Sequence, residues 1–140
     1  MSQENVETIR RCDAAISRGD VDSFLLGIHP DVEFIPRRAA VQGTYHGHAG
    51  MRKYITDNAE SFDLFEVGNT EFRDLGDRVL AFGTVRVRGR ESGVEVTHPT
   101  ALLVVFQDGK IIRFEDFGER DAALEAAGLS EQDTHSGEPS

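Results

Sequence analysis

The sequence predicts an α+β fold in which three N-terminal helices pack on a strongly curved, mixed or antiparallel sheet that encloses an apolar cavity. Apolar residues recur at helical spacing in the first half of the chain, and beyond about residue 62 the period changes to that of β-strands. Helices followed by a series of long strands are typical of α+β domains. The length of 140 residues fits one domain, which we place at residues 1–129.

The helices of the first half are predicted at residues 2–18, 21–28 and 49–61. In each of them the apolar side chains fall on one face, as in a helix that covers a core. Asp20 follows Gly19 and is placed to cap the second helix. A short extended segment at 32–35 and a loop at 37–47 connect the second helix to the third.

The strands of the second half are predicted at residues 64–73, 78–88, 94–106 and 110–117. Asp108 and Gly109, between the last two strands, are a strong two-residue hairpin signal. A final helix at 119–127 ends at Gly128, a residue that suits a helix C-cap. Residues 130–140 carry net negative charge and no apolar side chain, so we expect a disordered acidic tail.

The strand predicted at 94–106 is apolar on both faces. His98, Thr100 and Leu102 share one face, and Leu103 lies on the other. Both faces must therefore be covered, by helices on one side and, we expect, by a second copy of the chain on the other. Pro99 lies within the strand and predicts a bulge or bend that curves the sheet.

Composition excludes several classes of partner. The net charge is −10, from 15 basic and 25 acidic residues, and such a field repels nucleic acid and anionic membrane surfaces. The longest apolar run, 101–106, is too short to span a membrane, and the polar, acidic N-terminus is unlike a signal peptide, so we expect a cytoplasmic protein. Cys12 is the single cysteine, which allows neither an intrachain disulfide nor a cysteine-cluster zinc site.

Five segments together resemble the SnoaL-like branch of the nuclear transport factor 2-like superfamily. They are AAISRGD (14–20), HPDVEF (29–34), YHGHAGM (45–51), DGKIIR (108–113) and DAALEAAGL (121–129). The resemblance covers residues 4–129. It implies a cone-shaped, cystatin-like α+β barrel with an apolar pocket, commonly assembled as a homodimer. Members include polyketide cyclases, ketosteroid isomerases, epoxide hydrolases and dehydratases, so the resemblance implies a fold and no single reaction.

The chain departs from the ketosteroid isomerases at three positions. Such an enzyme needs a tyrosine and an acidic residue that donate to an oxyanion, together with an aspartate base. An ungapped comparison places Cys12, Ile35 and Leu102 at these positions, which argues against isomerase chemistry. We assign the same three residues to substrate binding.

The polyketide cyclases are the better match. They imply an aspartate that acts as acid and base beside a histidine in an apolar pocket, and His98 and Asp116 fit these roles, with Glu115 as the alternative carboxylate. Ile112, Phe114 and Asp116 share one strand face, which favours Asp116. Burial raises the pKa of such a carboxyl and a charged histidine opposes the shift, so the pair is suited to proton transfer near neutral pH. In the structural alternative, His98 hydrogen-bonds within the core or rim and Asp116 caps the chain or pairs with an arginine.

Other residues complete the expected substrate site. Tyr54, Phe114 and Leu102 are expected to shape the pocket, although a helical tyrosine at this spacing also suits the core. Arg37, with Arg38, is expected to hold a substrate carboxylate at the pocket mouth, unless the pair is solvated surface.

Two further chemistries have incomplete residue sets. His46 and His48 have the composition of a chelate, but no third ligand of suitable spacing is visible, so we predict no metal site. An epoxide hydrolase needs an Asp–Arg–Asp set, of which Arg86 and Asp116 supply two members. No second interior aspartate is evident from the sequence.

The sequence therefore predicts a protein that holds a small apolar molecule in a cavity. In the enzyme hypothesis, it catalyses cofactor-free, cyclase- or isomerase-like proton transfer on a carbonyl compound through His98 and Asp116. The alternative is a non-catalytic module that binds a hydrophobic ligand or only dimerises.

Overall fold

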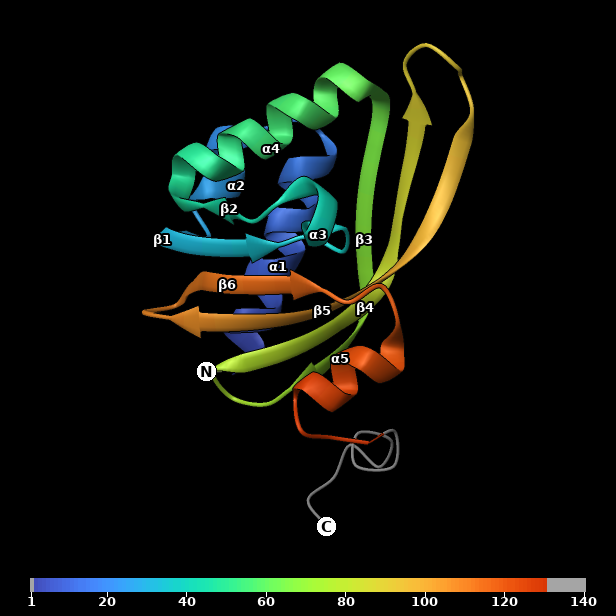
Figure 1. The fold of residues 1–140 in the computed structure, drawn as a ribbon. Helices are drawn as coiled ribbons and strands as arrows, with labels where there is room; N and C mark the ends of the chain where they lie inside the picture. The colour runs from blue at the N-terminus through green and yellow to red at the C-terminus, as the bar shows by residue number, and fades with distance from the viewer. Residues whose placement is uncertain (1, 131–140) are drawn as a thin grey trace.

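A computed structural model describes residues 2–130, so the predicted tail lies outside the described residues except for its first one. The helices are α1 (Ser2–Ser17), α2 (Val21–Leu25), α3 (Ala39–Gln42), α4 (Gly47–Ser61) and α5 (Arg120–Ala126). The strands are β1 (Ile28–Ile35), β2 (Tyr45–His46), β3 (Phe62–Asp74), β4 (Arg78–Gly89), β5 (Glu95–Gln107) and β6 (Lys110–Asp116). Figure 1 shows the helices packed on one curved sheet, which confirms the α+β class. Within residues 2–130, no helix is both long and apolar enough to cross a membrane.

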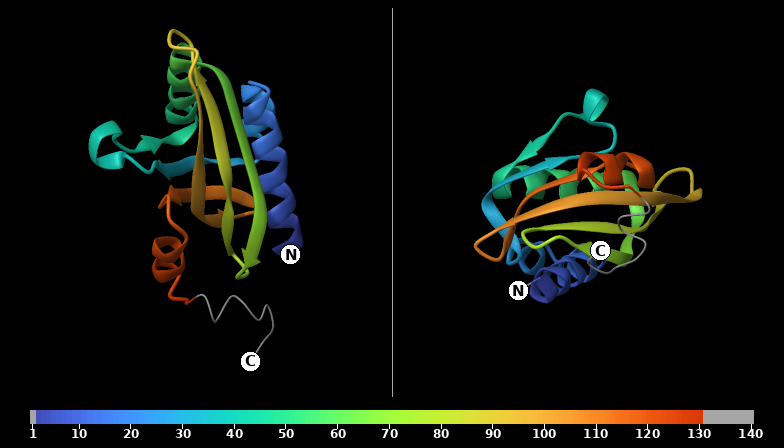
Figure 2. Two further views of the ribbon diagram at one scale, coloured as in Figure 1. Left: turned by 90° about the vertical axis from the view of Figure 1, so that its right-hand side faces the viewer. Right: turned by 90° about the horizontal axis from the view of Figure 1, so that it is seen from below.

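The strands form one mixed sheet. Their order is β2-β1-β6-β5-β4-β3, with β1 and β6 parallel and every other neighbouring pair antiparallel. β3, β4 and β5 are the longest strands, and Figure 2 shows α1 lying along one face of them. The helical layer and the bend of these strands enclose the site described below.

The N-terminal elements follow the prediction with one correction. Asp20 caps α2 as expected, because its Oδ1 accepts a hydrogen bond from the backbone N–H of Ser23 at 3.1 Å. α2 ends before residue 28, however, because Ile28 pairs with Ile111 of β6 and is fully buried. Strand pairing between distant segments therefore overrides a local helical pattern.

The segment predicted as a loop also contains regular structure. The short helix α3 and the two-residue strand β2 lie within residues 37–47. β2 forms because Tyr45 and His46 pair with Phe34 and Glu33 of β1. This pairing brings Tyr45 to the edge of the aromatic cluster that surrounds the site.

The two faces of the sheet are covered by different helices. The inner face carries Val79 and Val104 and packs against α1 and α4. The outer face carries Leu80 and Leu103, which pack with Leu124 of α5. The chain's own C-terminal helix thus covers an apolar surface for which we expected a second copy of the chain. The homodimer itself stays a prediction.

The structure has no bulge at Pro99, which was one of the two alternatives that the sequence offered for curving the sheet. The pairing of β4 with β5 continues without a shift through Thr84 and Pro99. The Pro99 carbonyl accepts a hydrogen bond from Arg37 and therefore points away from β4. The proline nitrogen, which has no N–H, lies on the same edge of β5. This edge is free here because the pairing with β6 ends at Leu102. The ladder loses no hydrogen bond there, and a bulge is unnecessary. A register shift that bends the long strands lies in β3, between Asn69 and Glu71.

Candidate functional site

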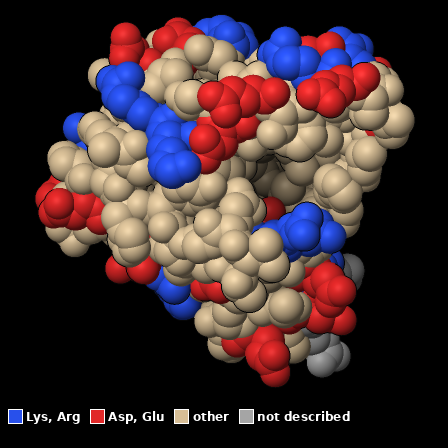
Figure 3. Space-filling model, turned by 45° about the horizontal axis from the view of Figure 1, so that its top comes forward, with Lys and Arg blue, Asp and Glu red and all other residues tan. Residues whose placement is uncertain are grey.

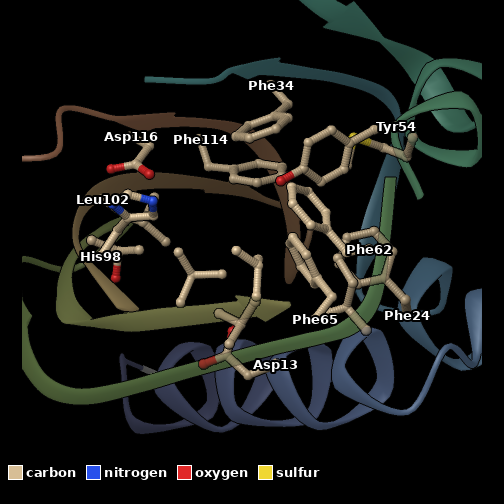
Figure 4. A pocket seen from close by; sticks show the side chains of 16 residues that line it. Asp13, Phe24, Phe34, Tyr54, Phe62, Phe65, His98, Leu102, Phe114 and Asp116 are labelled. Atoms are coloured by element: carbon tan, nitrogen blue, oxygen red, sulfur yellow. The ribbon is translucent and has the colours of Figure 1, made fainter. Parts of the chain in front are cut away.

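A cavity of about 210 Å³ lies between α1, α4 and the inner face of the sheet (Figure 4). An engineered protein cavity of about 150 Å³ is large enough to bind benzene, so this one has room for a molecule of one or two rings. Its lining residues are Asp13, Ile16, Phe24, Phe34, Met51, Tyr54, Phe62, Phe65, Val67, Val85, Val87, His98, Thr100, Leu102, Phe114 and Asp116. In the surface view, a hollow has an acidic group inside it and a basic side chain on its rim (Figure 3).

One end of the cavity is aromatic. Phe34 of β1 and Phe114 of β6 are register partners on parallel strands, which brings their rings into a stack with centroids 4.3 Å apart. The rings of Tyr54 of α4 and Phe34 are in a T-shaped contact with centroids 4.9 Å apart. The rings of Tyr54 and Phe65 of β3 are also T-shaped, with centroids 6.4 Å apart. Rings held in this way are a rigid apolar surface against which a flat ligand can pack.

Tyr54 also brings a hydroxyl to this apolar region. Burial raises the pKa of Tyr54 to about 12. The phenol therefore keeps its proton at neutral pH and is available as a hydrogen-bond donor. Figure 4 shows the Tyr54 side chain directed into the cavity beside Phe114.

Asp116 lies at the end of β6, where the strand alternation that places Phe114 in the cavity also places its carboxyl there. The Oδ1 atom accepts backbone hydrogen bonds from Gly118 at 2.9 Å and from Ala101 at 3.3 Å. Burial raises the pKa of Asp116, and these two hydrogen bonds and the charge of Arg37 only partly oppose the shift. The carboxyl is thus fixed in place by backbone groups and binds its proton more strongly than an exposed aspartate does.

His98 lies on the same strand face as Thr100 and Leu102, and all three line the cavity. Its side chain is exposed, whereas Thr100 is buried. Figure 4 shows the His98 ring and the Asp116 carboxyl on the same side of the cavity. No direct hydrogen bond joins these two described residues, so any proton exchange between them requires a mediating group or a movement of His98.

Asp13 of α1 is a second carboxyl in the cavity, and the sequence interpretation missed it. Its Oδ2 accepts a hydrogen bond from the backbone N–H of Asn69 at 3.1 Å, and the Asn69 side-chain amide donates to Oδ2 at 3.0 Å and Oδ1 at 3.3 Å. Burial raises the pKa of Asp13 to about 6, against the lowering effect of these hydrogen bonds. The available signal was its place at helical spacing between Ile9 and Ile16, where a charged residue interrupts the apolar stripe.

Two residues assigned to substrate binding lie outside the cavity. Cys12 faces α2, where its thiol lies 3.6 Å from the Phe24 carbonyl, and burial raises the pKa of that thiol to about 12. Ile35 follows the cavity-lining Phe34 in β1, so strand alternation turns its side chain away. In each case the neighbouring residue, Asp13 or Phe34, lines the cavity instead.

Arg37 also does not line the cavity. Its guanidinium donates to the Pro99 carbonyl at 3.4 Å, and its side chain packs beside Gly118. In this position its charge acts on Asp116 from outside the cavity, and the predicted role as a substrate clamp stays untested. Arg38 is exposed at the start of α3.

The residues considered for a metal or an epoxide hydrolase site are not brought together. His48 Nε2 lies 2.8 Å from the backbone carbonyl of Ile28, and residues 2–130 contain no group of three or more potential ligands placed for a metal ion. Arg86 lies on the outer face, where it pairs with Glu66 and Glu95 at 2.7 and 3.3 Å. It is therefore separated from Asp116 by the sheet.

The sequence model of the SnoaL-like domain matches residues 9–114, which is most of the chain. The chain belongs to the SnoaL-like family. This match confirms the resemblance that the five sequence segments indicated.

Solved structures and a curated sequence are similar to this chain over most of its length. TerC, crystallised with polyporic acid, is 30% identical with a TM-score of 0.74, over 87% of this chain and 96% of TerC. A nuclear transport factor 2-like protein of unknown function from Burkholderia pseudomallei is 25% identical with a TM-score of 0.74, over 91% of this chain and 97% of its own. An uncharacterized protein of Mycobacterium tuberculosis is 28% identical over 125 residues, which cover 87% of this chain and 94% of that protein. This SnoaL-like chain therefore spans nearly the full length of its relatives.

Proposed function

We propose that this SnoaL-like protein binds a small, largely apolar ring compound and moves a proton at a carbon next to a carbonyl group of that compound. The observation that supports this most is the placement of a half-buried carboxyl, Asp116, in a cavity that also has an aromatic end. The co-crystallisation of TerC with polyporic acid supports a small-molecule ligand for this related chain.

In this proposal, the ligand ring packs on Phe34 and Phe114 while its carbonyl lies between Tyr54 and Asp116. The Asp116 carboxylate takes a proton from the carbon beside the carbonyl, and the electron pair of the broken C–H bond moves to the carbonyl oxygen. The protonated Tyr54 hydroxyl donates a hydrogen bond to that oxygen as its charge develops. Asp116 then returns its proton to carbon, directly or by exchange with solvent through His98 at the open side. The raised pKa of Asp116 favours its protonated form after the first step.

A second candidate function is ligand binding without catalysis. It is favoured by the hydrogen bonds that hold Asp116 to the backbone of Ala101 and Gly118, because an aspartate in that place also fastens the end of β6. Under this alternative, the cavity binds the same class of compound and His98 and Asp116 have no role in turnover.

Deuterium exchange into α-tetralone, a small ring ketone, distinguishes the two functions. We expect the protein in heavy water to accelerate exchange at the carbon beside the carbonyl, as followed by NMR. Asp116→Asn should lower that rate about a hundredfold, within the usual range for a general base, and His98→Gln should lower it less. The matched control is Glu115→Gln on the same strand, because Glu115 pairs with Arg113 and does not line the cavity. Binding of α-tetralone without faster exchange, or unchanged exchange in Asp116→Asn, would favour the binding module.

A further inference from the structure

Asp13 is a cavity carboxyl that the proposed proton transfer does not use. It enters the cavity from α1, whereas Asp116 enters from β6, and Figure 4 shows the two carboxyls on different walls. A ligand in the cavity can therefore meet one carboxyl with its reacting group and the other with a second polar group.

The orientation of Asp13 is set by Asn69, at the register shift of β3. Asn69 is only 7% exposed, and its backbone N–H and side-chain amide both donate to the Asp13 carboxylate. Its remaining polar atom, Oδ1, accepts a hydrogen bond from the Thr100 hydroxyl at 3.3 Å. Thr100 itself is buried, so the chain Thr100–Asn69–Asp13 fixes the carboxylate in one orientation.

A glycine on the neighbouring strand makes this arrangement possible. Gly83 pairs with Asn69, and a Cβ atom at this position would overlap the backbone of Gly68 and Asn69. The two strands can therefore approach closely where the register shifts. At this register shift the Asn69 N–H donates to Asp13, so the bulge serves the orientation of a cavity side chain as well as the bend of the sheet.

The cavity lining sets the kind of group that fits against Asp13. No lysine or arginine is among the lining residues, whose only carboxyls are Asp13 and Asp116. An ionised carboxylate has about four positions at which to accept hydrogen bonds, and Asn69 approaches from the side of β3. The remaining acceptor position of Asp13 is open to a ligand. A ligand with its own carboxylate or phosphate would be repelled by Asp13 on one wall and by Asp116 on the other.

We propose that Asp13, positioned by Asn69 and Thr100, determines specificity by accepting a hydrogen bond from a hydroxyl or ammonium group of the ligand. This inference rests on the proposed function, because it assigns the second end of the same ring compound. The substrate class is thus a ring ketone with a hydrogen-bond donor away from its carbonyl and without an acidic group.

Calorimetric titration with α-tetralone and with three classes of its derivatives tests the inference. The classes are ring-hydroxylated, aminomethyl and carboxylated α-tetralones. We expect at least one hydroxyl or aminomethyl compound to bind about tenfold or more tightly than α-tetralone, as a hydrogen bond to a charged acceptor allows. Comparison of the hydroxylated with the aminomethyl compounds shows whether Asp13 prefers a neutral or a cationic donor. The carboxylated compounds should bind more weakly than α-tetralone.

The variants connect this preference to Asp13. In Asp13→Asn, the donor compounds should lose most of their advantage when their affinities are expressed relative to that of α-tetralone for the same variant. Thr100→Val keeps the shape of the cavity wall and removes the hydroxyl that donates to Asn69. It should lose a smaller part of the donor advantage, and it provides a second test if Asp13→Asn folds poorly. A donor advantage that survives in both variants, or the absence of any donor advantage, overturns the inference and leaves the proposed function standing if α-tetralone still binds and exchanges. Failure of every probe to bind overturns both.

Discussion

The inner and outer faces of the sheet bury similar apolar side chains but differ in how closely helices pack on them. On the outer face, α5 packs on the sheet, and Leu80, Leu103 and Leu124 form a buried apolar cluster. On the inner face, α1 and α4 leave a cavity into which Asp13 and Asp116 extend. The outer cluster is thus covered by the chain's own helix, whereas the inner face has space and polar groups for another molecule.

The charged side chains of the two faces differ in exposure and in whether they form ion pairs. The outer charges are exposed and paired, as in the contacts of Arg86 with Glu66 and of Arg88 with Asp63, both at 2.7 Å. The cavity lining has no lysine or arginine to pair with the inner carboxyls, and burial raises the pKa of both. Unpaired buried carboxyls reduce stability at neutral pH, and groups that are kept at such a cost are often functional.

Removal of an outer-face leucine should have the largest effect on stability. Leu124 is 2% exposed, so Leu124→Ala creates a new void and should lower the free energy of unfolding by about 2–5 kcal/mol. Leu102 is half-buried at the edge of an existing cavity, so Leu102→Ala removes less buried surface and should cost less than Leu124→Ala. Urea denaturation of both variants measures the difference. Equal losses would show that the inner face is packed as tightly as the outer face.

Asp13 should make stability depend on pH. Its pKa in the folded protein is about 6 against an ordinary value of 3.8, so the folded state holds the proton more tightly than the unfolded state. The resulting contribution to stability is full below about pH 4 and is lost as the pH rises through 6. A shift of this size corresponds to about 3 kcal/mol.

Urea denaturation at pH 4 and pH 7 isolates this contribution when the natural protein is compared with Asp13→Asn. The variant should lose less stability than the natural protein between the two values, by up to about 3 kcal/mol. Asp31→Asn, which removes an exposed carboxyl, is the matched control and should show the natural dependence. The same pH dependence in all three proteins would mean that Asp13 is more solvated than its position implies.

Strand alternation is the reason that part of the site is predictable from sequence. The period of two places Leu102 with His98, and Asp116 with Phe114, on faces that the structure confirms as cavity-lining. This rule needs only local information, because a side chain's face follows from its position in a strand. Their functional roles stay predictions, since a face does not specify a reaction.

The rest of the site depends on contacts between distant segments. The comparison that selected Cys12 missed Asp13 by one residue, and a step of one residue rotates a helical side chain by about 100°. Ile35 was selected in place of Phe34, and a step of one residue in a strand turns the side chain to the opposite face. Nothing local to Asp13 indicates that it meets Asn69, because the bulge that places Asn69 requires the pairing of β3 with β4.

A single outer-face charge should matter least. Arg86 pairs with Glu66 and Glu95, but all three side chains are between 45% and 47% exposed. Exposed pairs contribute little because water and salt screen them. After the change Arg86→Ala, Glu95 also keeps Arg88 as a neighbour at 3.5 Å. We therefore expect no resolvable change in Tm at low or high salt and no change in α-tetralone exchange. A loss of stability at low salt that disappears at high salt would instead show that the outer charges act as a cooperative network, and the two faces would then differ less than their geometry implies.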